Sequence, residues 1–191
     1  MAPLPFSAAE NGNAAVHGQI GTSVHGLVYT DPSNAAQSAV AVVANPDFSN
    51  AAHVQLDVVA KKAVPAGFAI AMNLPAPAGQ VRSAFIEGNV FDPGAAPKVE
   101  GAVVGTGAAA GALYSGLSQK AGGAGGGASD VAVSAGGIYY SIRLDLTASA
   151  TPGVVFDGST AMQKFRAAVR DRLGNDAVGQ AQFAVGKLEV R

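Results

Sequence analysis

The chain has 191 residues, no cysteine, and a formal net charge of -1 that arises from 12 Lys and Arg against 13 Asp and Glu. The length fits one domain of ordinary size, and the balanced charge argues against a protein that wraps nucleic acid, because that binding is dominated by neutralisation of phosphates. The absence of cysteine excludes disulfide bonds, thiolate chemistry and cysteine-based zinc sites.

The composition favours a protein that gains stability from neighbours. Hydrophobic residues make up 49% of the chain but aromatic residues only 6%, there are 25 Gly, and charged residues make up only 13%. Small side chains bury little apolar area each, and a surface with few charges packs against copies of itself without burying unpaired charge. We therefore expect a homo-oligomer.

The N-terminal region contains no obvious targeting signal. Residues 1–10 lack the basic region and the continuous apolar core of a secretory signal peptide, and no window reaches the roughly 18 consecutive apolar residues that a membrane-spanning helix needs. Two Val-His-Gly triplets at 16–18 and 24–26 flank a turn signal and predict a hairpin that ends near Tyr29.

A repeat follows this hairpin. The sequence DPSNAA at 31–36 is answered by DFSNAA at 47–52, and each copy precedes a Val-rich stretch. Asp, Ser and Asn side chains hydrogen-bond their own backbone in turns, so each copy predicts a polar turn that leads into a strand. The predicted strands of this region and the next are 39–44, 53–59, 68–74, 81–91 and 98–104.

Residues 101–137 differ from the rest in composition. This stretch is rich in Gly and Ala, including a GGAGGG run at 122–127, and ordering such a backbone costs much conformational entropy. We interpret it as an arm, insertion loop or linker that becomes ordered against a partner, with a weak helix within 108–120.

The C-terminal region predicts a strand, a helix and a strand. Apolar residues alternate cleanly with polar ones over 138–147. The sequence TAMQ at 160–163 offers a capping box, and Gly174 supplies a helix stop. Between them, apolar residues at helical spacing are Met162, Phe165, Val169 and Leu173. A last strand over 183–190, with a bulge near Gly186, would place its apolar groups on one face.

These elements predict a mainly β fold. We expect an antiparallel β sandwich, or a β-rich α+β domain, with one C-terminal helix and a Gly/Ala-rich arm. Residues 1–100 form the β-rich region, 101–137 the arm or insertion, and 138–191 the strand-helix-strand unit that completes the same domain.

Catalytic and metal-binding patterns are weak. The GTGAAA sequence at 105–110 resembles a dinucleotide fingerprint with Asp130 about twenty residues on, but that motif needs a firm helix after the glycines. Ser115 has the wrong spacing for a nucleophile elbow. We interpret Asp92 and Asp157 as turn residues, and the histidines as polar residues on solvated strand faces; the histidines are His17, His25 and His53. No catalytic, cofactor or metal residue is assigned.

The predicted helix has a locally basic face formed by Lys164, Arg166, Arg170 and Arg172. A solvated amphipathic face explains it without a ligand, and the last two arginines suit the helix dipole. Nucleic acid is therefore not expected as a main partner.

The overall style of the chain resembles virion structural proteins of bacteriophages, of the coat or decoration type. The shared features are the lack of Cys and Trp, the abundance of Ala, Gly, Val, Ser and Asn, the many short strands and the polyglycine arm. The resemblance implies a non-catalytic subunit that self-assembles or binds a capsid lattice, with copies of itself and other capsid proteins as partners, in a virion made in the host cytoplasm. Candidate assembly contacts lie in the two repeated turns, the 138–147 strand and the arm: Ser33, Asn34, Ser49, Asn50, Tyr139, Arg143, Gly122 and Gly125.

Two alternatives remain open. A β-sandwich module that binds a ligand or a surface would use loop polar groups and aromatic platforms at Tyr29, Tyr114, Tyr139 or Tyr140. A nucleotide-binding enzyme would use the Gly105–Gly107 loop.

Overall fold

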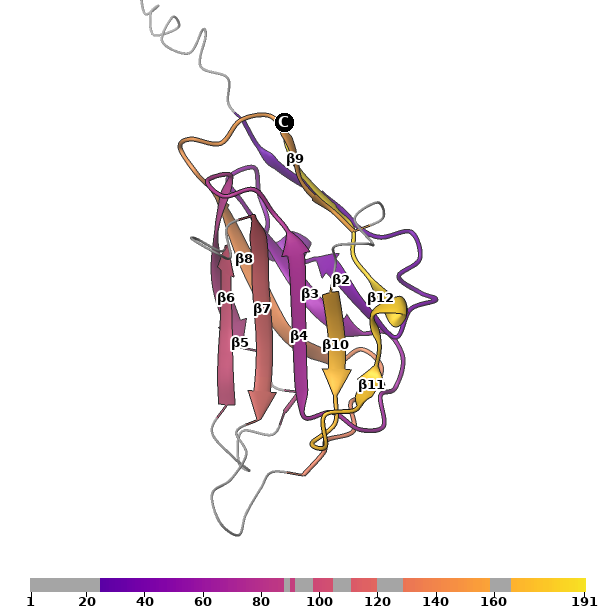
Figure 1. Cartoon of the computed structure of the whole chain (residues 1–191). Coiled ribbons are helices and arrows are strands. Elements are labelled where there is room, and N and C mark those ends of the chain that lie inside the picture. Colours follow the sequence, from indigo (N-terminus) through magenta and orange to yellow (C-terminus); the bar gives the residue numbers. More distant parts are fainter. Residues whose placement is uncertain (1–24, 88–89, 92–97, 105–110, 120–128, 159–165) are drawn as a thin grey trace, which may run out of the picture.

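The structure, a computed structural model, describes residues 25–87, 90–91, 98–104, 111–119, 129–158 and 166–191, with the backbone alone at 87 and 98–104. Within these residues two five-stranded sheets lie face to face, and a three-stranded sheet lies at one end of the sandwich (Figure 1). The predicted mainly β fold is confirmed in this form.

The first five-stranded sheet has the order β12-β2-β3-β8-β5. Its neighbours pair antiparallel except for β12 and β2, which pair parallel. The strands are β12 (Phe183–Ala184), β2 (Val40–Ala44), β3 (His53–Ala60), β8 (Ile138–Leu146) and β5 (Val81–Glu87). The two copies of the repeat thus lead into two strands that pair with each other.

The second five-stranded sheet has the order β11-β10-β4-β7-β6 and is antiparallel throughout. Its strands are β11 (Asp176–Val178), β10 (Arg166–Arg170), β4 (Ala69–Pro75), β7 (Ala112–Gln119) and β6 (Lys98–Val104). The three-stranded sheet has the order β1-β13-β9, with β1 (Leu27–Thr30), β13 (Lys187–Val190) and β9 (Gly153–Asp157). Short 3-10 turns are η1 (Pro46–Phe48) and η3 (Gln180–Gln182).

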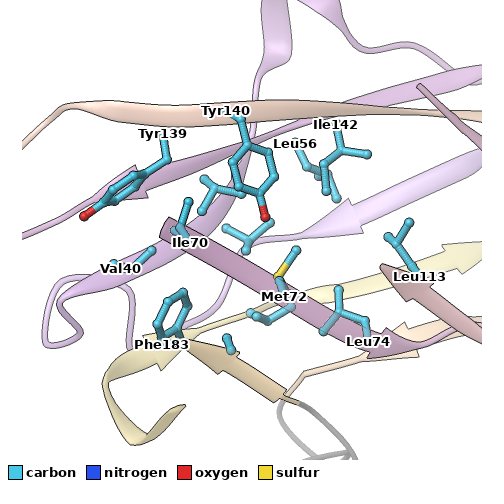
Figure 2. Packing of buried hydrophobic residues seen from close by; sticks show 14 of the residues in the cluster. Val40, Leu56, Ile70, Met72, Leu74, Leu113, Tyr139, Tyr140, Ile142 and Phe183 are labelled. Atoms are coloured by element: carbon cyan, nitrogen blue, oxygen red, sulfur yellow. The ribbon is translucent and has the colours of Figure 1, made fainter. Parts of the chain in front are cut away.

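The core lies between the two five-stranded sheets because alternate side chains of each strand point inward. Figure 2 shows Tyr140 and Ile142 of β8 facing Ile70, Met72 and Leu74 of β4 across this layer. Fully burying a side chain of this size contributes about 1.5–3 kcal/mol. The predicted strand over 53–59 is confirmed as β3, and its alternate residues Val54, Leu56 and Val58 are all buried.

The predicted C-terminal helix is wrong. Residues 160–165 lie outside the described part of the chain, but 166–170 form strand β10, which pairs with β4 along its whole length. Ala167 and Val169 point into the core, whereas Leu173, which the helix would have buried, is 82% exposed in the turn that follows. A neighbouring strand that supplies hydrogen bonds and a buried face outweighed the local helical spacing.

The predicted arm or insertion over 101–137 is corrected in the part of this stretch that the structure describes. Residues 98–104 and 112–119 form β6 and β7, which pair with each other inside the second sheet, and the weak helix predicted within 108–120 is strand β7. Beyond residues 120–128, which lie outside the described part of the chain, Val133 exchanges two backbone hydrogen bonds with Val64. The polyglycine run with Gly122 and Gly125 lies outside the described residues, so its predicted role stays a prediction.

The three-stranded sheet is joined to the sandwich by Tyr29. Its hydroxyl donates a hydrogen bond to the Val42 carbonyl (2.9 Å) and accepts one from the Gly186 amide (2.8 Å). A side chain at Gly186 would collide with the Thr30 carbonyl and the Tyr29 hydroxyl, so only glycine allows the chain to pass here from β12 to β13. The predicted irregularity near Gly186 is therefore a crossing between two sheets.

An irregularity in β8 reverses the predicted orientation of its first residues. The pairing of β3 with β8 shifts register between Val58 and Val59. As a result Tyr139, predicted on the outer face, is fully buried against Phe91, while Ile138 is 38% exposed. A bulge moves one side chain to the other face of a sheet, which strict alternation cannot anticipate.

Candidate binding face

The outward residues of strands β4 and β7 in the second sheet are mostly small. On β4, Ile70, Met72 and Leu74 point into the core, which leaves Ala69, Ala71 and Asn73 on the outside. On β7 the outward residues include Tyr114 and Gly116. None of these outward residues is charged, although the outer face of a sandwich is normally covered by long polar side chains.

The register of the sheet arranges these residues in three rows that cross the strands. The first row is Arg166, Asn73 and Tyr114, the second is Ala168, Ala71 and Gly116, and the third is Arg170, Ala69 and Ser118. Adjacent rows lie about 6.8 Å apart, because two residues separate them along each strand. We call this surface the β4–β7–β10 face.

The middle row is the floor of a hollow of about 860 Å³. Its members carry at most a methyl group, whereas the first row carries a guanidinium, an amide and a phenol. A side chain at Gly116 would also lie 3.0 Å from the Ile70 carbonyl oxygen, so the backbone of β4 is close to it. Asp176 and Gln180 complete the lining beyond the edge of β10.

The charges of the β4–β7–β10 face lie at its β10 end. The Arg170 Nε lies 3.0 Å from the Asp176 Oδ1, so this arginine is neutralised. In the described part of the chain, no hydrogen bond or ion pair engages the side chains of Arg166, Asn73 or Tyr114. Tyr114 is 40% exposed. The first row therefore offers polar groups that have no described partner.

The outer face of the first sheet has the opposite character, because its polar groups pair with one another. The Arg143 Nε lies 2.8 Å from the Asp145 Oδ1. The Asp57 carboxylate, only 7% exposed, accepts hydrogen bonds from Ser141 Oγ (2.6 Å) and Asn45 Nδ2 (2.9 Å). These groups satisfy a buried carboxylate and leave a self-contained polar face.

A second hollow, of about 630 Å³, lies where the loop after β1 meets β12 and β13. Ser33 and Asn34, two of the predicted contacts, line it together with Asp31 and Lys187. Asp31 Oδ1 accepts a hydrogen bond from the Ala44 amide, and Lys187 Nζ lies 2.8 Å from Glu189 Oε1. These charged groups are already engaged in local interactions.

The structure separates the remaining predicted contacts. Ser49 and Asn50 shape the turn before β3: Ser49 Oγ donates to the Asn45 carbonyl, and Asn50 Oδ1 accepts from the Ala52 amide. Arg143 is exposed on strand β8 of the first sheet, whereas Ser33 lies in the loop after β1. Tyr139 is removed from the predicted contacts because it is buried.

Of the four tyrosines predicted as aromatic platforms, only Tyr114 remains available to a ligand. Burial raises the pKa of Tyr139 and Tyr140 and hides both rings, and Tyr29 is committed to backbone groups. Tyr114 is exposed and stands at the rim of the 860 Å³ hollow. Tyr114 is one of four tyrosines predicted as platforms, and it falls within the weak helix predicted at 108–120. The alternation in ALYSGLSQ at 112–119 is the sequence signal that indicates its outward position on a strand.

The weak catalytic patterns gain no supporting geometry. Ser115 is buried and its hydroxyl shares a hydrogen bond with the Tyr140 hydroxyl (2.9 Å). The 105–110 glycines lie outside the described residues, but they connect antiparallel strands β6 and β7, whereas a dinucleotide site needs a helix after the glycines. Within the described residues no three His, Asp or Glu side chains gather as a metal site, and no helix is long and apolar enough to cross a membrane.

Comparisons with known proteins find similarity only among solved structures. No protein-family model and no curated protein matches the chain. A type II cohesin–X-dockerin complex from Acetivibrio cellulolyticus matches with a TM-score of 0.48 and 12% identity, covering 78% of this chain and 94% of that one. The second type II cohesin module of the ScaA scaffoldin from the same organism matches with a TM-score of 0.48 and 11% identity, covering 78% of this chain and 93% of that chain. Type II cohesin A11 from Bacteroides cellulosolvens matches with a TM-score of 0.43 and 12% identity, covering 79% of this chain and 96% of that chain.

Proposed function

We propose that this chain is a non-catalytic β-sandwich module that binds another protein with the β4–β7–β10 face. The observation that carries the proposal is the 860 Å³ hollow over a floor of Ala and Gly, next to the exposed Tyr114 and to Arg166, which has no ion-pair partner among the residues that the structure describes. Tyr and Arg are enriched where proteins meet, and a small-residue floor lets a partner approach the sheet backbone closely.

The energetics of the two outer faces favour this choice. Covering the β4–β7–β10 face removes methyl groups, a glycine and one aromatic ring from water, which is favourable, and it also covers Asn73, Arg166 and the Arg170–Asp176 pair. Covering the first sheet would desolvate the Arg143–Asp145 pair and the hydrogen-bonded surroundings of Asp57, and buried ion pairs repay that cost only with excellent geometry. The uncharged middle row of Ala168, Ala71 and Gly116 therefore favours the second sheet as the binding face.

The predicted virion role and homo-oligomer stay predictions. No contact, charge or hollow among the described residues favours a capsid subunit over other binding proteins. The predicted β-sandwich binding module agrees better with the geometry.

The proposal is tested with partners selected from a displayed library of protein fragments and then purified. We expect binding to fall at least tenfold in Ala71→Gln, because a long side chain fills the middle row. Ala84→Gln is the matched control, since Ala84 is an exposed strand residue on the outer face of the first sheet. Affinity is measured by calorimetry, and circular dichroism checks that both variants fold.

Three outcomes would overturn the proposal. Equal losses in the two variants would show that the contact is not on the second sheet. Selection of glycans but no protein in a parallel array, with loss of signal in Tyr114→Ala, would make the ligand a carbohydrate. A tight homo-oligomer in light scattering that Ala71→Gln dissociates would make the occupant a second copy of the chain.

A further inference from the structure

We infer that the segment bound by the β4–β7–β10 face presents a carboxylate to Arg166 beside a small apolar side chain that fills the middle row. This inference rests on the proposed function and specifies the partner's chemistry. It follows from the charge of the face, the polar groups of its first row and the shape of its floor.

The two arginines of β10 differ in whether they have an acidic partner. Arg170 is paired with Asp176, whereas Arg166 has no acidic partner in the described part of the chain. The face thus carries two positive charges against one negative charge, although the whole chain has a formal net charge of -1. A partner that brings a carboxylate to Arg166 completes the pairing.

The first row is suited to a carboxylate. Arg166 lies opposite Asn73, which lies opposite Tyr114, so a guanidinium, an amide and a phenol follow one another across three strands. Adjacent strands are about 4.8 Å apart, which places the Asn73 amide within reach of an anion held at Arg166. Arginine presents a planar fork of N–H donors that matches a carboxylate with two parallel hydrogen bonds.

The middle row specifies the neighbour of that carboxylate. Ala168, Ala71 and Gly116 leave a depression between the first and third rows, which are about 13.6 Å apart. The methyl groups and backbone of this row offer a bound side chain no charged group to pair with. An apolar side chain next to the acidic one would fill the depression and contact the Tyr114 ring.

The same charges argue against a second copy of this face as the occupant. In a two-fold symmetric contact both copies use the same surface, so two faces that each carry an excess of positive charge would meet. Like charges placed opposite each other are unfavourable and suppress such pairing. A different, acidic partner satisfies the face without that cost.

The experiment uses a random-peptide display library selected on the purified full chain. We expect the enriched peptides to share a Glu or Asp next to a small apolar residue. In titrations with the synthetic peptides, Arg166→Glu should weaken binding about tenfold or more, and a peptide with Lys in place of the acid should recover binding to this variant. Arg172→Glu is the matched control, because this exposed arginine lies in the turn outside the hollow.

The outcomes separate this inference from the proposed function. Peptides that are lost on Ala71→Gln but carry no acid, or that tolerate Arg166→Glu, would overturn the inference and leave the binding face in place. Peptides that tolerate both Ala71→Gln and Arg166→Glu, or the absence of any specific peptide, would overturn both. If Arg172→Glu weakened peptide binding as much as Arg166→Glu, the preference for acidic peptides would reflect only the overall charge of the chain, and the inference would also be overturned.

Discussion

The two adjacent tyrosines of β8 differ in how their hydroxyl groups are satisfied. Both rings are fully buried. The Tyr140 hydroxyl shares a hydrogen bond with Ser115 Oγ (2.9 Å), whereas the Tyr139 hydroxyl has no partner among the described residues. A buried polar group without a hydrogen bond costs folding free energy, so the same substitution at the two positions has opposite expected effects.

We expect Tyr139→Phe to raise the free energy of unfolding by about 1 kcal/mol, because it removes a desolvated hydroxyl. Tyr140→Phe should lower it by about 1 kcal/mol, since it leaves the buried Ser115 hydroxyl unpaired. Urea denaturation of the two variants measures both values. A loss of stability in Tyr139→Phe equal to that in Tyr140→Phe would contradict this account.

Alkaline pH provides an internal check on these variants. Burial raises the pKa of both phenols above the ordinary value of about 10. Above pH 10 the unfolded chain releases these protons while the folded chain keeps them, so the free energy of unfolding falls as the pH rises. Each Tyr→Phe variant removes one such group and should show a shallower fall than the wild type. An unchanged slope would mean that the phenol is not buried in solution.

At the scale of elements, the three-stranded sheet depends on a few specific contacts. Tyr29 joins β1 to β2 and to the crossing at Gly186 through two hydrogen bonds. Its ring also lies edge-on to Phe156 of β9, with 6.2 Å between the ring centroids. One side chain therefore touches the sandwich and two segments of the end sheet.

We expect Tyr29→Phe to lower the free energy of unfolding by about 1–3 kcal/mol, because the Val42 carbonyl and the Gly186 amide lose their partner. Amide hydrogen exchange should accelerate first in β1 and β13. The control is Tyr114→Phe, which removes a hydroxyl without a described partner from an exposed ring and should change stability by less than about 0.5 kcal/mol. Equal effects of the two variants would refute the role of Tyr29.

The elements also show what local sequence can and cannot predict. Strands β2, β3 and β8 were predictable, because their apolar alternation and flanking turns act over a few residues. Strand β10 was not, since Met162, Phe165, Val169 and Leu173 match a helical face and only pairing with β4 selects the extended form. Strand β7 was obscured by its small residues, whose alternation carries little hydrophobic contrast.

At the scale of the whole molecule, the pairing of distant segments decides the architecture. Strand β1 pairs with β13, and the two lie at opposite ends of the described chain, so no short-range pattern indicates their contact. The β4–β7–β10 face, which we propose as the binding surface, likewise forms from three strands that are brought together by sheet order. Arg166 and Tyr114 were singled out in the sequence for other reasons, and only the register places them in one row.

The most direct test of the account is an NMR footprint on the labelled full chain during titration with a selected, purified binding partner. We predict that the largest amide shift changes fall on Asn73, Gly116 and Ala168, with little change on β3 and β8. Shift changes concentrated on the outer face of the first sheet, around Gln55 and Arg143, would contradict the assignment of the binding face to the second sheet.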